Sequence, residues 1–270
     1  MNKELKKTYS YWNKNPTRYK FESFKKEATI IYKKEHWMEE EIERAKIKNL
    51  KVLDAGCGQG LNLWKMLQCK ADVRGIDFSD NAIKECKRRL SLEGYDPSIV
   101  NVADIQNLKE IKNNTFDVVF SLGVLHHIPD FSAGLKELHR VCKPGGRIII
   151  MVYSKNNIQN FGLRLFRFFG KSLFKFIKPN KNKKYGTFWH ELLLCPIWNT
   201  YSRKQLRKLF ENVGFINVRF KRTFTGLTRV NDFIPLPKFI NNIFYKLDNL
   251  TKRKLGFYEM VYARKARIKI

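Results

Sequence analysis

Three carboxylates follow short β-branched runs of the sequence, and a glycine-rich turn separates the first from the second. Asp54 lies in the run 51–55, which leads into a turn with three glycines, Gly56, Gly58 and Gly60. Glycine permits positive φ and allows a backbone to approach a ligand closely. Asp77 ends the next run, where a carboxylate can accept both hydroxyls of a ribose. These residue types in this order predict a nucleoside site.

The glycine spacing separates two kinds of nucleoside ligand. A dinucleotide fingerprint, Gly-x-Gly-x-x-Gly, would place its third glycine at Leu61, whose side chain is too large for close helix packing. NAD and FAD are therefore disfavoured. Asp104 follows the third run, where it could accept from the exocyclic amine of adenine. An adenosine without pyrophosphate fits all three acids.

A histidine pair follows the fourth run. His126 and His127 stand in the segment 123–130, at the same predicted edge of the sheet. A histidine with a pKa near neutrality can take a proton from an oxygen, nitrogen or activated carbon. The alternative is that one of them only bonds the backbone or orients Asp130. As a general base, we place His127 ahead of His126.

The elements that must position these residues alternate between strand and helix. Strands are expected at 51–55, 72–77, 98–103, 116–122 and 147–153, and helices at 62–69, 81–92 and 132–142. This alternation is typical of βαβ units and a parallel sheet. A helix at 202–213 and strands at 216–224 and 258–265 complete a sheet of about seven strands.

These motifs resemble the class I S-adenosylmethionine-dependent methyltransferases, and among them the type 11 and quinone-biosynthesis group. The resemblance rests on VLDAGCGQG (52–60), GIDFS (75–79), ADIQNL (103–108), FDVVFSLGVLHHIPD (116–130) and KPGGRIII (143–150). It covers roughly residues 48–155, with weaker likeness at 200–220 and 257–265. It implies a Rossmann-like seven-stranded sheet with helices on both faces, S-adenosylmethionine as cofactor, and methyl transfer.

The resemblance also implies roles for individual residues. The backbone of the glycines would run close to the methionine part of the cofactor. Asp77, with Phe78 beside it, would hold the ribose. Asp104 and Ile105 would contact the adenine, and Leu122 would line the sulfonium. The alternative is that Asp77 only precedes a helix capped by Ser79 and that Asp104 is a solvated turn residue.

The segment 1–48 is predicted to be helical and resembles a lid over the cofactor. Its aromatic residues Tyr9, Trp12 and Tyr19 could face the site, because aromatic faces attract a sulfonium as they attract ammonium. Ordinary packing onto the sheet is the alternative. His190 and Tyr201 are candidate acceptor-site residues, because polar groups alternate there with apolar ones.

The segment 161–178 combines a basic stripe with a phenylalanine-rich face. Such a helix suits the surface of an anionic membrane, and the basic continuation to residue 184 adds attraction. The alternative is a cap that buries its phenylalanines over the active site. Either reading favours an apolar or lipid-linked acceptor, such as a quinone, an isoprenoid lipid or a surface-glycan intermediate.

Charge distinguishes these acceptors from RNA. The net charge is +28, of which residues 153–270 carry +21 and residues 51–152 only +2. A basic region can follow phosphates, so an RNA-modifying methyltransferase remains the alternative. Ser121, Leu122 and Gly123 stand after the fourth strand, where base-amino methyltransferases carry Asp or Asn followed by Pro-Pro-aromatic. This difference makes nucleic acid the less favoured partner.

The five cysteines form no Cys-x-x-Cys pair, which is typical of a reducing cytosol. No apolar run is long enough to cross a membrane, so we expect a cytoplasmic protein that could lie on the inner face of the membrane. We expect no metal site. The predicted organisation is a lid (1–48), a cofactor-binding core (49–153), a basic aromatic cap (154–200) and a C-terminal completion of the sheet (201–270). The acceptor atom and the oligomeric state are not predicted.

Overall fold

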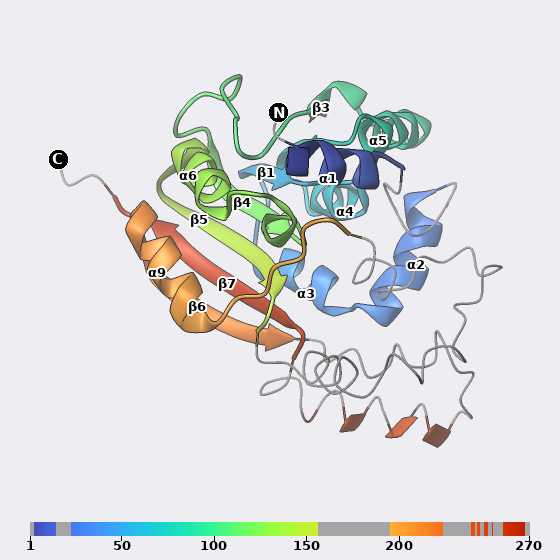
Figure 1. Ribbon diagram of the computed structural model, residues 1–270. Helices are drawn as coiled ribbons and strands as arrows, with labels where there is room; N and C mark the ends of the chain where they lie inside the picture. Colours follow the sequence, from blue (N-terminus) through green and yellow to red (C-terminus); the bar gives the residue numbers. More distant parts are fainter. Residues whose placement is uncertain are drawn as a thin grey trace.

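The computed structural model describes residues 3–14, 23–155, 195–223, 239–240, 242–243, 246–247, 250 and 256–267. Within them, seven strands form one sheet in the order β3-β2-β1-β4-β5-β7-β6 (Figure 1). The strands are β1 (Lys51–Ala55), β2 (Asp72–Asp77), β3 (Val100–Val102), β4 (Phe116–Leu122), β5 (Cys142–Tyr153), β6 (Phe215–Thr223) and β7 (Tyr258–Lys265). The predicted seven-stranded α/β sheet is confirmed.

The pairing of the strands places their ends at two opposite edges. Strands β1 to β5 are parallel, whereas β7 runs antiparallel to both β5 and β6. The last residues of β5 and β6, Tyr153 and Thr223, both pair with Tyr258, the first residue of β7. The chain therefore leaves towards residues 156 and 224 from the edge that holds the carboxyl ends of the parallel strands.

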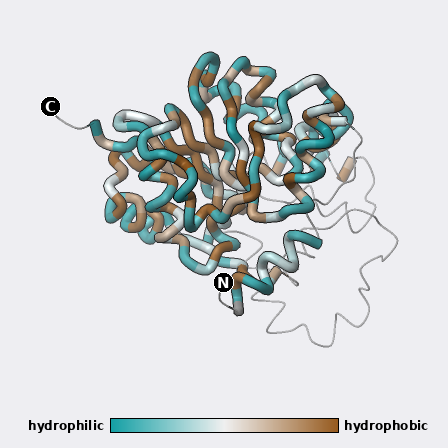
Figure 2. The backbone as a smooth tube through the Cα atoms, turned by 90° about the horizontal axis from the view of Figure 1, so that it is seen from above, coloured by the Kyte–Doolittle hydropathy of each residue, from teal (hydrophilic) through white to brown (hydrophobic). Residues whose placement is uncertain are grey.

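Helices cover both faces of the sheet. They are α1 (Lys3–Lys14), α2 (Phe24–Lys34), α3 (Trp37–Arg44), α4 (Leu61–Gln68), α5 (Asp80–Leu92), α6 (Phe131–Val141) and α9 (Arg203–Val213), with 3-10 turns η1 (Pro97–Ile99) and η2 (Leu125–His127). Helices α2 to α5 pack on one face and α6 and α9 on the other, each over its own cluster of buried apolar side chains. Consecutive residues of β4, such as Val118 and Val119, enter opposite clusters. Figure 2 accordingly shows hydrophobic residues along the central strands.

Three predicted strands have different bounds in the structure, and the one expected at 216–224 begins only one residue earlier, at Phe215. The expected strand 98–103 is limited to 100–102, because Asp96 caps the 3-10 turn Pro97–Ile99, accepting from the backbone N–H of Ser98. The expected strand 147–153 begins earlier, at Cys142, which pairs with Phe116 before the register shifts. The Pro-Gly-Gly turn therefore lies inside β5, directly after α6.

The predicted N-terminal lid divides into two parts. Phe24 of α2 and Trp37 and Ile42 of α3 are buried in the core, so these helices belong to the layered domain. Of the described N-terminal helices, α1 alone lies over the carboxyl edge of the sheet (Figure 1). Most of the predicted cap, including the stripe 161–178 and the basic run up to 184, lies outside the described residues.

Candidate active site

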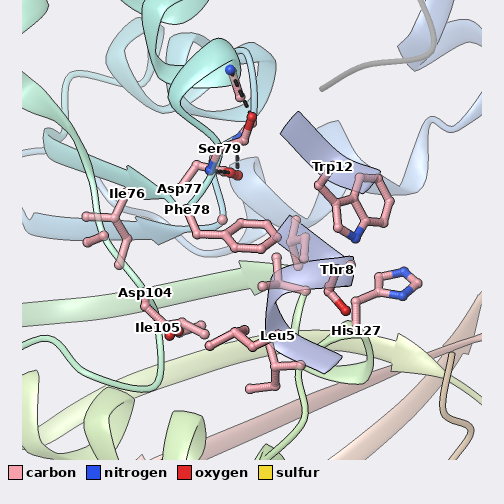
Figure 3. Close-up of a pocket in the computed structure, with 18 residues that line it drawn as sticks. Leu5, Thr8, Trp12, Ile76, Asp77, Phe78, Ser79, Asp104, Ile105 and His127 are labelled. Atoms are coloured by element: carbon pink, nitrogen blue, oxygen red, sulfur yellow. Dashed lines mark hydrogen bonds between the residues drawn. The ribbon is translucent and has the colours of Figure 1, made fainter. Parts of the chain in front are cut away.

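A cavity of about 200 Å³ lies at the carboxyl edge of the sheet, under α1 (Figure 3). The segments after β1, β2, β3 and β4 all contribute to it, because parallel strands end at the same edge. The lining residues are Leu5, Thr8, Trp12, Gly56, Gly58, Ile76, Asp77, Phe78, Ser79, Ala82, Ala103, Asp104, Ile105, Leu122, Gly123, Val124, His127 and Ile128. The motifs that follow these four strands in the sequence therefore meet in one place.

The absence of a side chain has different consequences at two glycines of the turn after β1. Gly56 has φ +88°, and a Cβ atom there would lie 2.1 Å from Cγ2 of Val124. Gly58 has φ +55°, but a Cβ atom there would meet no protein atom within 4 Å. Gly56 is therefore required by the packing of the loop, whereas Gly58 leaves open space on the cavity side.

Asp77 is held by backbone N–H groups at the end of β2. Its Oδ2 accepts from the N–H of Gly58 at 3.0 Å, and its Oδ1 accepts from the N–H of Ser79 at 2.9 Å. Burial raises the pKa of Asp77, although the N–H groups of Ser79, Gly58 and Phe78 oppose the shift. The carboxylate is fixed in orientation and lines the cavity, where its remaining lone pairs can accept from hydroxyls.

Asp104 and Ile105 lie on the far side of the cavity. Asp104 accepts from the backbone N–H of Gln106 at 2.9 Å and from its Nε2 at 3.2 Å. The Oε1 of Gln106 in turn accepts from the N–H of Asp130, the residue that caps α6. This network orients Asp104 as an acceptor at the cavity wall, beside the buried side chain of Ile105.

Asp54 is a carboxylate buried beneath the loop. Its side chain is 2% exposed, and within the described chain its Oδ2 has no hydrogen-bond partner. Burial, with a smaller contribution from the charge of Asp77, raises the pKa of Asp54 to about 7. An unpartnered buried oxygen is costly, so this position favours a ligand that brings a positive charge or a donor near it.

The two histidines occupy different environments. His127 lines the cavity, and its Nδ1 lies 2.8 Å from the carbonyl oxygen of Ile197. A carbonyl only accepts, so Nδ1 carries the proton and Nε2 is the basic nitrogen of the neutral ring. His126 is fully buried and is not a lining residue; its ring lies 3.8 Å, between centroids, from that of Tyr153. Burial, and secondarily His127, hold the pKa of His126 well below its usual value.

Comparisons with known proteins decide the family. Residues 53–150 match the methyltransferase domain family. The demethylmenaquinone methyltransferase of Staphylococcus aureus is 33% identical over 188 residues, which cover 66% of this chain and 73% of that relative. The chain belongs to the S-adenosylmethionine-dependent methyltransferases. It is therefore an enzyme that uses S-adenosylmethionine as its cofactor.

Solved structures show the same fold for this methyltransferase. A Thermotoga maritima S-adenosylmethionine-dependent methyltransferase, described as a possible histamine N-methyltransferase, aligns with TM-score 0.60 and 13% identity, over 96% of this chain and 99% of that one. Phosphoethanolamine N-methyltransferase 2 of Haemonchus contortus, bound to S-adenosylmethionine, aligns with TM-score 0.53 and 17% identity, over 82% and 49%. The class I fold implied by the sequence motifs is confirmed.

The cavity fits the cofactor. The unpartnered Oδ2 of Asp54 suits the ammonium of its methionine part, and Gly58 leaves open space for it beside the loop. The fixed carboxylate of Asp77 suits the two hydroxyls of its ribose. These are observations of polarity and space, and they agree with the order of the motifs along the chain.

Helix α1 closes the cavity of the methyltransferase. Leu5, Thr8 and Trp12 line it, and the Trp12 ring lies 5.0 Å, between centroids, from that of His127. Asn13 attaches the helix to the start of α5: its Oδ1 accepts from Ser79 Oγ at 3.1 Å and from the N–H of Asn81 at 3.0 Å. Leu5, Thr8 and Asn13 were not predicted from the sequence, because a single residue of ordinary type on an amphipathic helix carries no distinguishing signal.

The other predicted site residues lie away from the cavity or outside the described chain. The Tyr9 hydroxyl donates to Asp80 and its ring packs on Phe78, so Tyr9 supports the wall from outside. Gly60 begins α4 and is not a lining residue, because its space is occupied by Cys86 and Phe24. Tyr201 packs on Phe131 rather than in the cavity. Tyr19 and His190 are not among the described residues.

The described residues hold neither a membrane-spanning helix nor a metal-binding cluster. No helix among them is long and apolar enough to cross a bilayer. In the same part of the chain, no group of three or more His, Cys, Asp or Glu side chains gathers as a metal site would require.

Proposed function

We propose that this methyltransferase transfers a methyl group to a small, apolar or lipid-linked acceptor. One observation carries the proposal: no lysine or arginine is among the described residues that line the cavity, although the chain has a net charge of +28. An acceptor rich in phosphate or carboxylate would require cations at this wall. The wall instead offers apolar side chains, among them Leu5, Leu122 and Ile128.

The relative from Staphylococcus aureus supports the same acceptor class. Its name states that it acts on demethylmenaquinone, and 66% of the present chain aligns with it. A quinone with an isoprenoid tail combines a small reactive ring with a large apolar part. We infer an acceptor of this kind, an isoprenoid lipid or a lipid-linked intermediate.

The residues of the cavity divide between holding the cofactor and positioning the acceptor. We assign the ribose to Asp77, with Phe78 beside it, and the adenine amine to Asp104 beside Ile105. We assign the ammonium to Asp54. Bound S-adenosylmethionine supplies an electrophilic methyl group on its sulfonium. Because that group is already activated, orienting the acceptor beside Leu122 can account for much of the rate.

His127 is the group we assign to proton removal. The bond from its Nδ1 to the Ile197 carbonyl fixes the tautomer in which Nε2 is basic. Trp12 packs near the ring and limits its rotation. An acceptor proton on oxygen, nitrogen or activated carbon would pass to Nε2 as the new bond to the methyl group forms.

We further propose that the protein associates peripherally with anionic membranes. The predicted segment 161–184 is one candidate surface. A second observation supports membrane association: Phe239, Ile243 and Leu250 lie in short helical pieces and are 65%, 49% and 77% exposed. The chain leaves β6 towards these residues from the carboxyl edge of the sheet, and exposed apolar side chains favour a position at a membrane surface.

The acceptor can be identified by following the methyl label. Purified protein would be incubated with methyl-labelled S-adenosylmethionine in two separate reactions. One contains a reduced demethylated isoprenoid quinone, and the other contains bulk tRNA. We expect label in the organic phase and none in RNA. Label only in the RNA would overturn the apolar acceptor and favour the RNA-modifying alternative.

The role of His127 requires a pH-rate profile. With an accepted acceptor, His127→Ala should lower kcat and remove the acid limb of the profile, while leaving S-adenosylhomocysteine binding within about twofold. An unaltered profile would exclude His127 as the base.

Membrane association can be measured by co-sedimentation with anionic vesicles at two salt concentrations. Leu250→Ser should reduce the bound fraction, whereas Leu92→Ser, which removes a leucine 66% exposed on α5, should not. Equal binding of both variants would show that the exposed surface around Leu250 does not bind the membrane.

A further inference from the structure

A second cavity, of about 250 Å³, lies at the opposite edge of the sheet from the cofactor. It is formed where β4 and β5 begin and where the antiparallel β7 ends. Its lining residues are Leu50, Asp117, Lys143, Pro144, Gly145, Gly146, Arg147, Arg264 and Arg267. Four of these side chains are cationic and one is a carboxylate.

Two of the cations face each other across the strands. Arg147 of β5 and Arg264 of β7 are direct partners in the antiparallel register. Like charges at such a position destabilise a sheet, because the side chains project on the same side from neighbouring backbones. Burial, and secondarily the charge of Arg264, lower the pKa of Arg147. The pair therefore stores an unfavourable interaction that an anion between the two guanidinium groups would relieve.

The carboxylate in this cavity is already engaged. Asp117 Oδ1 accepts from Nζ of Lys143 at 2.6 Å, and its Oδ2 accepts from the N–H of Lys51 at 2.9 Å. These contacts outweigh burial and lower the pKa of Asp117. Within the described chain, the guanidinium groups of Arg147 and Arg267 form no hydrogen bond or ion pair, although the Arg147 carbonyl oxygen accepts from Sγ of Cys142. The positive charge of the cavity is thus largely uncompensated by the protein.

The turn in β5 shapes the cavity. Gly145 has φ +78°, and a Cβ atom there would lie 3.1 Å from Nε of Arg267, so this side chain packs directly over the turn. A guanidinium N–H of Arg264 reaches the carbonyl oxygen of Gly145 at 3.4 Å. At the glycine turn, Arg264 of β7 and Arg267, just after β7, lie against the backbone of β5 and around one space.

We propose that this cavity binds a phosphate group through Arg147, Arg264 and Arg267. Guanidinium groups present planar pairs of N–H donors that match the oxygens of phosphate. The site is distinct from the cofactor cavity, since the two lie at opposite edges of the sheet. It does not depend on the identity of the methyl acceptor. The phosphate could belong to a small diffusible molecule or to a lipid headgroup.

Binding of inorganic phosphate and pyrophosphate tests the site. Both would be titrated calorimetrically into the full chain at constant ionic strength set with chloride. We expect saturable binding by the wild type, and at least a tenfold loss of affinity in Arg147→Gln and in Arg264→Gln. Arg88→Gln serves as the control, because Arg88 is ion-paired with Glu85 on α5. Absence of saturable binding, or equal binding by all variants, would overturn the proposal.

Stability without phosphate gives an independent readout. If the two arginines repel each other, Arg147→Gln should unfold at the same temperature as the wild type or higher, yet lose the stabilisation by pyrophosphate. A large loss of stability in the absence of phosphate would show instead that Arg147 has a structural role and would contradict the repulsion on which the site rests. S-adenosylhomocysteine binding should be unchanged in these variants, which separates this test from that of the methyltransferase site.

The source of the phosphate is distinguished with vesicles. Phosphatidylglycerol vesicles that retain the wild type but not Arg264→Gln would assign the phosphate to a lipid headgroup. Retention that is independent of Arg264, together with calorimetric binding that depends on it, would assign the phosphate to a diffusible molecule.

Discussion

The two edges of the sheet carry opposite charges. At the carboxyl edge, Asp77 and Asp104 line a cavity with no lysine or arginine among its described lining residues, and Asp54 is buried beneath the glycine loop. At the amino edge, Lys143 and three arginines surround a cavity whose single carboxylate is already paired. The same strands support both edges. The overall charge of +28 therefore says little about the ligand of either site.

Topology explains why these groups gather at the two edges. The buried central strands have apolar side chains on both faces, so charged groups are confined to the strand ends. The strand order reverses between β1 and β4, and the segments after these strands diverge there to leave a cavity. At the other edge, the antiparallel β7 brings its basic end beside the start of β5. Parallel strands alone would not create that contact.

The largest effect is expected from Asp54→Asn. The folded-state pKa of Asp54, about 7, is raised above its ordinary value of 3.8, so the native state holds a proton that the unfolded state releases. Stability without cofactor therefore falls as the pH rises from about 4 to 7 and is then constant. At pH 8 the amide should raise the free energy of unfolding by a few kcal/mol, on the order of 4 at most. Chemical denaturation at pH 5 and pH 8 measures this.

The same carboxylate should make cofactor binding depend on pH. Ionised Asp54 attracts the ammonium of the methionine part, so wild-type affinity for S-adenosylhomocysteine should fall as the pH drops below about 7. Asp54→Asn should bind more weakly and lose this dependence. A pH-independent wild type would contradict the assignment of Asp54 to the ammonium.

Asp77→Ala tests the second acid of the carboxyl edge. Two charge-assisted hydrogen bonds to a ribose are together worth about 3 kcal/mol, which predicts a loss of about a hundredfold in S-adenosylhomocysteine affinity by calorimetry. Asp117→Ala is the matched control, since this aspartate also accepts from two N–H donors but lies at the amino edge. Equal losses in the two variants would show that the effect is structural.

The sequence predicted the carboxyl edge well and the amino edge not at all. Motifs around Asp77, Asp104 and His127 are local, and each follows a strand that could be recognised from its own residues. The amino-edge cavity joins Arg147 to Arg264, which are far apart in the chain. In the sequence, Arg147 belongs to the nearly neutral core segment and Arg264 to the basic C-terminal segment. Only the antiparallel register brings them together.

Burial was the second property that the sequence could not supply. His126 and His127 are adjacent, but one lies in the core against Tyr153 and the other lines the cavity. Similarly, Tyr9 and Trp12 share one helix, yet Tyr9 bonds Asp80 on the outside while Trp12 faces inward. Such differences depend on how α1 is docked, which no single motif specifies.

A smaller effect distinguishes histidines at the two edges. The pKa of His126 is held well below its ordinary value of 6.5 by burial and by His127, so the unfolded state binds a proton that the native state excludes. Stability should therefore fall as the pH drops below about 6.5, by up to about 1.4 kcal/mol per pH unit. His126→Phe should reduce this acid sensitivity in urea unfolding at pH 7.5 and 5.5.

His139 is the comparison at the amino edge. Partial burial and the charge of Lys265 lower its pKa, but its ring is less deeply buried than that of His126. His139→Gln should therefore change the acid sensitivity less than His126→Phe. The reverse order would show that charge at the amino edge, rather than burial at the carboxyl edge, controls acid stability.

The smallest effect concerns the closure of the carboxyl edge by α1. Asn13→Ala removes two hydrogen bonds, to Ser79 and to the N–H of Asn81, that attach the helix to α5. At about 1 kcal/mol for each bond, or less where water replaces it, S-adenosylhomocysteine should dissociate a few times to about tenfold faster. Asn101→Ala, at an exposed asparagine of β3 that bonds Ser98, should leave the rate unchanged. Stopped-flow tryptophan fluorescence measures both, and equal rates in wild type and Asn13→Ala would show that docking of α1 does not limit release.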